Sequence, residues 1–280
     1  MKMQVNNLNS TISAFIHTRN YWLRILITGF LLFLTAIVTF NLTKNSNLIP
    51  TVVITGNFLV PVAFVAFFYE RRDRFSVSMA STSISFLYGG ILGTAAAALL
   101  EPIFISTLSF STAFSVGIIE ELTKLIGVFF IAKNRKYNSE MDGIILGAAA
   151  GMGFAAFEST GYAVSAFLQS GGSMSYAVFI TLIRGLASPV GHGTWTAIFA
   201  SILLRESVRG KFYFNSKVAS AYLTVVLLHG LWDGVPFVIS FIIPSVHAIL
   251  IGQLVIGISG MIILNRRWQE ARKESSMRLA

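Results

Sequence analysis

The stretch from Thr112 to Ala132 reads TAFSVGIIEELTKLIGVFFIA and combines an apolar run of membrane length with three charged residues at its centre. About 20 apolar residues cross the hydrocarbon core of a bilayer as a helix, so the run by itself predicts a transmembrane helix. A charge at the bilayer centre costs roughly 2.5–3.5 kcal/mol on insertion scales. A span that keeps Glu120, Glu121 and Lys124 therefore predicts a membrane protein with a buried polar site.

The composition of the whole chain supports a membrane-embedded fold. Of its 280 residues, 54% are hydrophobic and only 12% are charged, with a mean hydropathy of +0.71. A soluble domain carries about 25% charged residues, so this chain has too few charges to cover a water-soluble globule. The absence of cysteine excludes a disulfide scaffold, a thiolate metal site and a cysteine nucleophile. The net charge of +9 lies in short clusters rather than in one basic patch, so no nucleic-acid partner is predicted.

Stretches of similar length on both sides of this one predict an all-α, polytopic membrane bundle of about eight helices. The eight predicted spans are Leu23–Leu42, Leu48–Tyr69, Ser83–Leu100, Thr112–Ala132, Gly143–Leu168, Ser175–Leu204, Val218–Val235 and Val246–Leu264. We expect Pro189 and Gly191 to kink or break the sixth span. The apolar segment Gly234–Ser245, which contains Pro236 and Pro244, is expected to be interfacial or re-entrant.

The basic residues predict the orientation of the bundle. Eighteen Lys and Arg fall on one side of the predicted spans and Lys44 alone on the other. The positive-inside rule then places both termini in the cytoplasm. This divides the chain into a cytoplasmic N-terminal segment (1–22), a single membrane-embedded domain (23–264) and a basic cytoplasmic tail (265–280). With no soluble domain, a multi-pass protein of the cell membrane must carry out any chemistry within or at the bilayer.

Ionisable residues recur in the fourth to seventh spans. They are Glu120, Glu121, Lys124, Glu158, Arg184, His192, His229 and Asp233. Counted at 1.5 Å per residue from the predicted cytoplasmic ends, the carboxylates and imidazoles of four spans lie roughly 17–23 Å deep. Such residues inside a membrane pair with one another or face a wet cavity. Their common depth predicts one shared site.

Spacing within the spans refines this prediction. Residues four apart share a helix face, so Glu120 can pair with Lys124, and Asp233 can hold the imidazole of His229. Glu120 and Glu121 point about 100° apart on a helix, so one of them is expected in the pocket while Lys124 or Arg184 holds the other. Small residues that precede Glu158 on its own face permit close helix approach. They are Gly147 and Gly151.

These motifs resemble those of the PrsW family of intramembrane proteases over roughly residues 55–265. The EExxK motif of the family resembles Glu120-Glu121-Leu122-Thr123-Lys124, and its FxxxE motif resembles Phe154-Ala155-Ala156-Phe157-Glu158. Its sixth-helix histidine resembles His192 in the stretch Pro189-Val190-Gly191-His192, and its HxxxD motif resembles His229-Gly230-Leu231-Trp232-Asp233. The similar type II CAAX prenyl endoproteases have EExxxR in place of EExxK and a histidine at the position of Glu158.

The resemblance implies hydrolysis of a peptide bond in a membrane-anchored, single-pass protein with a transmembrane helix, such as an anti-sigma factor. Proteolysis needs a base for water, a group that stabilises the oxyanion and an acid for the leaving amine. In this interpretation Glu120 is the general base and Glu121 a second candidate. His192 and His229 are expected to polarise the carbonyl group or to bind a metal, and Asp233 is expected to orient His229. Glu158 is expected to bind a metal or to act as the acid. Lys124 and Arg184 are expected to support the acidic side chains.

The charge balance leaves the cofactor open. Four carboxylates against Lys124 and Arg184 give the site a net charge of −2. A divalent cation such as Zn²⁺, held by Glu158, His192 and His229, would cancel it, and so would two bound protons in a metal-free glutamate protease. The usual classification of the family favours the metal.

The alternative functions are a proton-coupled transporter, which the lack of an internal repeat disfavours, and a non-catalytic scaffold. Substrate identity and oligomeric state stay open.

Overall fold

The computed structural model describes residues 20–72, 77–133, 137–208, 210–243 and 245–279, and these form helices with no named β-strand among them. The all-α prediction is therefore confirmed. The helices are α2 (Tyr21–Thr43), α3 (Ile49–Glu70), α4 (Met79–Leu87), α5 (Gly93–Phe104), α6 (Phe110–Ala132), α7 (Glu140–Gln169), α8 (Met174–Ala187), α9 (His192–Arg205), α10 (Ser216–Ile242) and α11 (Val246–Leu279). Most of the predicted N-terminal segment, residues 1–19, lies outside the described residues.

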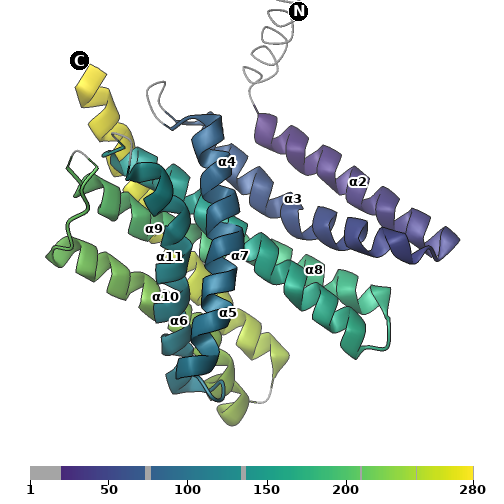
Figure 1. The fold of residues 1–280 in the computed structure, drawn as a ribbon. Coiled ribbons are helices and arrows are strands. Elements are labelled where there is room, and N and C mark those ends of the chain that lie inside the picture. Colours follow the sequence, from purple (N-terminus) through teal and green to yellow (C-terminus); the bar gives the residue numbers. More distant parts are fainter. Residues whose placement is uncertain (1–19, 73–76, 134–136, 209, 244, 280) are drawn as a thin grey trace, which may run out of the picture.

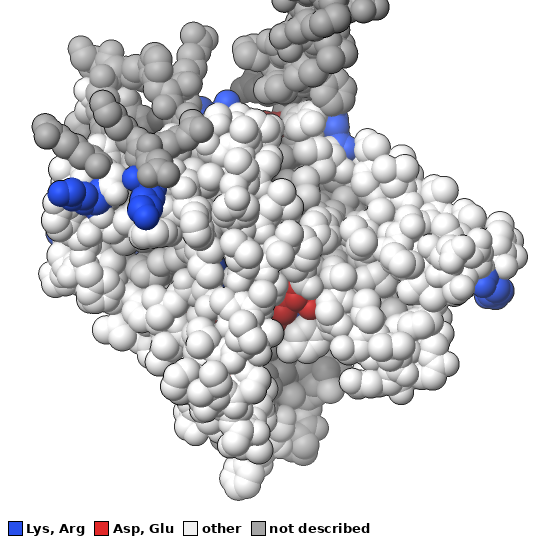
Figure 2. All heavy atoms as spheres, in the orientation of Figure 1, with Lys and Arg blue, Asp and Glu red and all other residues white. Residues whose placement is uncertain are grey.

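The described chain is a multi-pass membrane bundle. Seven helical segments within it are long and apolar enough to cross a membrane. The eighth predicted span is α6, which has 23 residues but an apolar run interrupted by its three central charges. In Figure 1, α2 begins at the end of the molecule where α11 finishes, as an even number of crossings requires. Figure 2 shows most of the visible lysine and arginine atoms toward that end.

The predicted break in the sixth span is confirmed and lies between α8 and α9. Proline at position 189 cannot donate to the carbonyl oxygen of Gly185, and the Ser188 hydroxyl donates to that oxygen instead, at 2.8 Å. A 3₁₀ turn over Ser188–Val190 follows, and Gly191 takes non-helical angles (φ −112°, ψ −118°). The break makes His192 the first residue of α9.

The prediction of an interfacial or re-entrant Gly234–Ser245 segment is wrong for most of its length. Helix α10 continues through Pro236 to Ile242. A proline inside a helix leaves the carbonyl four residues earlier without its partner. Here that carbonyl belongs to Trp232, and Gln253 of α11 donates its side-chain amide to it at 3.3 Å. Helix α11 likewise runs on through the predicted tail to Leu279.

Helix α7 occupies the middle of the bundle and packs against α3, α4, α6, α8 and α9 (Figure 1). Its contact with α9 is a backbone contact. A β-carbon at Gly143, Gly147 or Gly151 would collide with the carbonyl oxygen of Ala200, Thr196 or His192 respectively. Without a hydrophobic driving force between helices in lipid, such close packing is what holds them together. The predicted role of Gly147 and Gly151 is confirmed, and Gly151 fixes where α9 begins.

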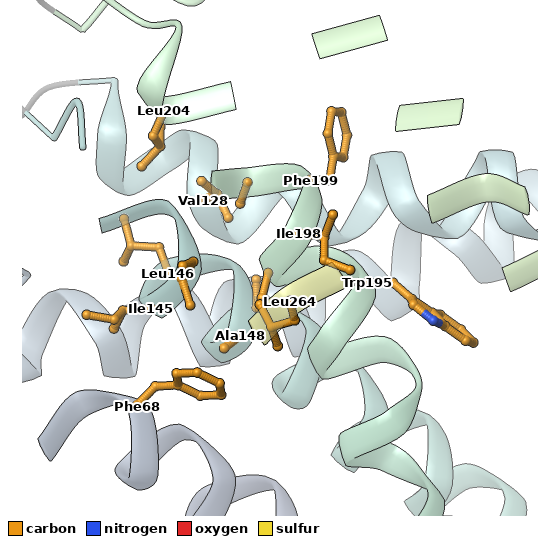
Figure 3. Close-up of a cluster of buried hydrophobic side chains, with 14 of the residues drawn as sticks. Phe68, Val128, Ile145, Leu146, Ala148, Trp195, Ile198, Phe199, Leu204 and Leu264 are labelled. Atoms are coloured by element: carbon orange, nitrogen blue, oxygen red, sulfur yellow. The ribbon is translucent and has the colours of Figure 1, made fainter. Parts of the chain in front are cut away.

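The largest buried apolar cluster joins α3, α6, α7, α9, α10 and α11. Figure 3 shows part of it, with Leu204 and Trp195 at opposite ends and Ile198 and Phe199 between them on α9. The Trp195 side chain is fully buried, and its ring centroid lies 4.7 Å from that of His229. The apolar core therefore ends against an imidazole.

We expect Gly151→Ala to destabilise the protein by about 1–3 kcal/mol, because the added methyl group overpacks the α7–α9 contact. Gly161→Ala in the same helix is the matched control, since its β-carbon would meet nothing within 4 Å. Thermal unfolding in detergent measures both. Equal unfolding temperatures for the two variants would contradict the proposed backbone contact.

Candidate active site

A cavity of about 440 Å³ lies among helices α5 to α10. Its ionisable lining residues are Glu101, Glu120, Glu158, Arg184, His192, His229 and Asp233. Figure 2 shows acidic atoms in a hollow between α5 and α8, on a surface that is otherwise almost entirely uncharged in that view. In the described chain, side chains from the four predicted spans therefore meet at one site.

The Lys124 ammonium lies at the inner wall of this site. It is fully buried, and its Nζ is 3.0 Å from Glu120 Oε2 and 2.7 Å from Glu121 Oε1. It also lies 2.8 Å from His192 Nδ1 and 4.5 Å from the centroid of the Phe154 ring. A buried ammonium needs such partners, since an unpaired charge in this environment is very costly.

The two adjacent glutamates have different surroundings. Glu121 is fully buried and away from the cavity, with contacts to Lys124, to His229 Nδ1 at 2.9 Å and to the Thr196 hydroxyl at 3.1 Å. Glu120 lines the cavity, and apart from the Lys124 ion pair its Oε2 has no hydrogen-bond partner among the described residues. As predicted, one of the two glutamates, Glu120, lies in the pocket and the other, Glu121, is held by a cation. Lys124 nevertheless contacts both of them.

The contacts of His192 define its tautomer. An ammonium group has no lone pair to offer, so Lys124 donates and His192 Nδ1 accepts. The proton of the neutral ring is then on Nε2, which lies 3.1 Å from Glu158 Oε2 and donates to it. The ring also lies against the edge of Trp195, at 5.5 Å between centroids.

His229 has a carboxylate on each side. Its Nδ1 donates to Glu121, while its Nε2 lies 3.3 Å from Asp233 Oδ2 and 3.6 Å from Glu120 Oε2. A bare lone pair on Nε2 would face two negative oxygens, which is unfavourable. A cation at this point, either a proton on Nε2 or a metal ion, relieves that repulsion.

Arg184 and His192 both contact the same carboxylate oxygen of Glu158. Arg184 Nη2 lies 2.7 Å from Glu158 Oε2, and Arg184 Nε donates to Ser159 Oγ at 3.1 Å. The guanidinium carbon of Arg184 also stacks 3.9 Å from the centroid of the Tyr162 ring. Charge-assisted bonds of this kind fix a carboxylate in place. Arg184 therefore supports Glu158, whereas Lys124 supports the acidic pair on α6.

Three of these residues form a group that could hold a metal ion. Glu120, His192 and His229 each offer one donor atom, and the three atoms lie within 4.8 Å of one another. The set differs from the expected one, because Glu120 replaces Glu158. One carboxylate and two imidazoles match known catalytic zinc sites, and the repulsion at His229 Nε2 favours a cation. The residues therefore fit a metal, although one bound to His192 Nδ1 would displace Lys124.

Sequence reasoning missed two parts of the site. It did not include Glu101, just before Pro102, among the expected site residues, whereas this residue lines the cavity. It did not mention Thr196, whose buried hydroxyl donates to Glu121. A carboxylate just before Pro102, within an apolar run, was a signal for Glu101. Thr196 lies four residues after His192, which was the corresponding signal for a second polar group on that helix face.

Comparison with known proteins identifies relatives of this chain. A family model described as "PrsW family intramembrane metalloprotease" matches residues 78–261. A curated relative, "Protease PrsW" of Halalkalibacterium halodurans (strain ATCC BAA-125 / DSM 18197 / FERM 7344 / JCM 9153 / C-125), is 27% identical over 180 residues. These residues cover 62% of this chain and 78% of that protein. No solved structure matches the chain.

The family match covers more than half of the chain and includes every ionisable residue that lines the cavity. It also favours proteolysis over the transporter and scaffold alternatives. The chain therefore belongs to the PrsW family of intramembrane metalloproteases, and it is an intramembrane protease.

Proposed function

We propose that this chain hydrolyses a peptide bond of a single-pass, membrane-anchored protein, of the anti-sigma-factor kind, in the cavity among α5 to α10. The observation that carries the proposal is the meeting of Glu120, His192 and His229 from three helices at one cavity, with Glu158 from a fourth. Four separate spans have no structural need to bring such groups to a common point.

The edges of the cavity suit a substrate that arrives through the bilayer. Ile103 on α5 and Leu186 on α8 are each 71% exposed, and the acidic hollow of Figure 2 lies between these helices. In a membrane such exposed apolar side chains contact lipid. A transmembrane helix of the substrate can therefore reach the cavity laterally between α5 and α8.

Glu120 is the general base in this proposal. Its carboxylate borders the cavity, whereas Glu121 is committed to Lys124, His229 and Thr196. Glu120 takes a proton from water as the water oxygen attacks the carbonyl carbon. When the C–N bond breaks, the leaving nitrogen receives that proton back from Glu120.

The two histidines and their partners act on the carbonyl oxygen. Glu121 fixes the ring of His229 through Nδ1 and so directs Nε2 toward Glu120 and Asp233. This gives Glu121 the orienting role that the sequence suggested for Asp233. His192 presents an N–H at Nε2, which Glu158 holds. A preorganised donor at the developing oxyanion lowers the barrier to attack.

Glu120, His192 and His229 would hold a zinc ion through one atom each, which would leave the second carboxylate oxygen of Glu120 to act as the base. When bound, Zn²⁺ supplies Lewis-acid polarisation of the carbonyl or of the attacking water. The donor set supports this choice, because carboxylate and imidazole ligands suit zinc. The ionised carboxylates around the site also offset the charge of a divalent ion.

We expect Glu120→Gln to lower the rate of cleavage by about 10²–10⁴-fold, because the isosteric amide cannot accept the proton. The assay reconstitutes the protein in liposomes with a panel of tagged single-pass membrane proteins from the same genome. Glu270→Gln on α11 is the control, because its carboxylate is half-exposed and does not line the cavity. Full cleavage by both Glu120→Ala and Glu121→Ala would refute the assigned base.

Arg184→Gln should reduce cleavage by about 10–100-fold, since outer partners of an active-site group typically contribute this much. The amide loses the ion pair that fixes Glu158 beside His192. Arg184→Lys should recover part of the activity, because it keeps a positive charge but cannot bond both Glu158 and Ser159 in the same way. Wild-type cleavage by the glutamine variant would show that Glu158 needs no such support.

Elemental analysis tests the metal. We expect about one zinc per chain in protein purified without chelators, and a loss of most of it in His229→Ala. Dialysis against a chelator should abolish cleavage, and added Zn²⁺ should restore it. Fully active protein with less than about a tenth of an equivalent of any metal would instead support the glutamate mechanism.

A further inference from the structure

A further cavity, separate from the active site, lies where α9, α10 and α11 meet. It has a volume of about 490 Å³, within the range of small-ligand sites. Its lining residues are Ile198, Ile202, Arg205, Ser216, Lys217, Ser220, Ala221, Thr224, Ile263 and Arg267. We call this the basic groove. None of these residues belongs to the active-site cavity.

The lining of the basic groove changes from charged to apolar along α9 and α11, and from charged to small uncharged side chains along α10. Arg205 ends α9, and Ile202 and Ile198 lie one and two turns deeper. Lys217 lies in the first turn of α10, with Ala221 one turn deeper. On α11, Arg267 lies at the start of the predicted tail (265–280), and Ile263 lies one turn toward the membrane. The groove therefore has a cationic rim and an apolar floor.

Three carboxylate groups, of which Glu140 is buried, hold the cations of this rim in place from outside the groove. Glu140, only 2% exposed, lies 3.4 Å from Arg205 Nη1 and 3.3 Å from Arg267 Nη1. Glu206 lies 3.2 Å from Lys217 Nζ and 3.4 Å from Arg205 Nε. Glu270 lies 3.0 Å from Arg267 Nη1, and none of the three carboxylates lines the groove. Because a guanidinium carries five N–H donors, both arginines keep the capacity to bond a ligand in the groove.

The segments that surround the rim are strongly basic. Residues 205–217 and 265–280 together contain nine Lys and Arg but only three Glu. The positive-inside rule assigns these segments to the cytoplasmic face. Basic pockets between transmembrane helices on that face are a known form of anionic-lipid site. A free anion would use only the cations of the rim, whereas a lipid would also cover the isoleucine side chains of the floor.

We propose that the basic groove binds an anionic phospholipid, with the phosphate at Arg205, Lys217 and Arg267 and acyl-chain carbons over Ile198, Ile202 and Ile263. Ser216 lies at the rim beside Lys217 and Ser220 one turn deeper on α10, and their hydroxyls suit the glycerol backbone. The lipid bridges α9, α10 and α11. Since α9 begins at His192 and α10 carries His229, the bound lipid stabilises the two helices that bring the histidines together.

Native mass spectrometry of the full-length protein in non-ionic detergent tests this proposal without any cleavage assay, so its outcome is independent of the proposed function. The protein is titrated separately with phosphatidylglycerol and phosphatidylcholine. We expect tighter binding of phosphatidylglycerol. The double variant Lys217→Gln, Arg267→Gln should weaken it by about ten- to thirty-fold, since each cation near the surface contributes about a tenfold factor or less.

Two further variants separate the groove from general surface charge. Arg272→Gln, Lys273→Gln removes the same charge from α11 outside the groove and should leave phosphatidylglycerol binding unchanged. Ser220→Phe fills the groove, keeps every charge and should weaken binding. Equal losses in the two charge variants, undiminished binding in Ser220→Phe, or equal affinity for the two lipids would overturn the proposal. So would displacement of phosphatidylglycerol by inorganic phosphate, which would show that the ligand is the free anion.

Discussion

The fully buried Lys124 ammonium contacts the side chains of Glu120, Glu121 and His192, and the remaining geometry of the site depends on it. Removal of one partner from a buried ion pair costs about 3–5 kcal/mol, because the other charge stays uncompensated. The cation therefore ties α6 to α9 through His192 and also holds the two acids of α6 together. It also sets the tautomer of His192, and through Glu121 it reaches His229.

This polar centre exists only because the surrounding backbones lie very close together. The glycines of α7 bring the start of α9 against the central helix, and the break at Pro189 provides that start. An unbroken helix would carry His192 at a different height and rotation. The same backbone approach excludes lipid from the far side of the site, so the charges of Lys124 and Glu121 meet neither lipid nor water.

Helices α9 and α10 combine two different environments along their lengths. At one level they present His192 and His229 to the cavity, and at their other ends they present arginine and lysine to the basic groove. The proposed lipid and the proposed substrate would thus contact the same pair of helices in different layers of the membrane.

Much of this protein is determined by its sequence alone. The apolar runs locate the spans, since the bilayer demands helices of a certain length, and the i, i+4 spacing of Glu120 with Lys124 and of His229 with Asp233 predicts contacts within one helix. Pro189 and Gly191 locate the break. These features are local, and so is the physics behind them. The PrsW-like order of the motifs indicated the kind of chemistry, which is peptide-bond hydrolysis.

Only the tertiary structure decided which groups meet between helices. The pairing of Glu121 with His229, the place of Glu101 in the cavity and the choice of Glu120 beside the two imidazoles all depend on how each helix is rotated about its axis. The continuation of α10 past Pro236 depends on Gln253, which belongs to the next helix. Rotation and partner choice arise from packing over the whole bundle, and a pattern within one span contains no information about the residues that will face it.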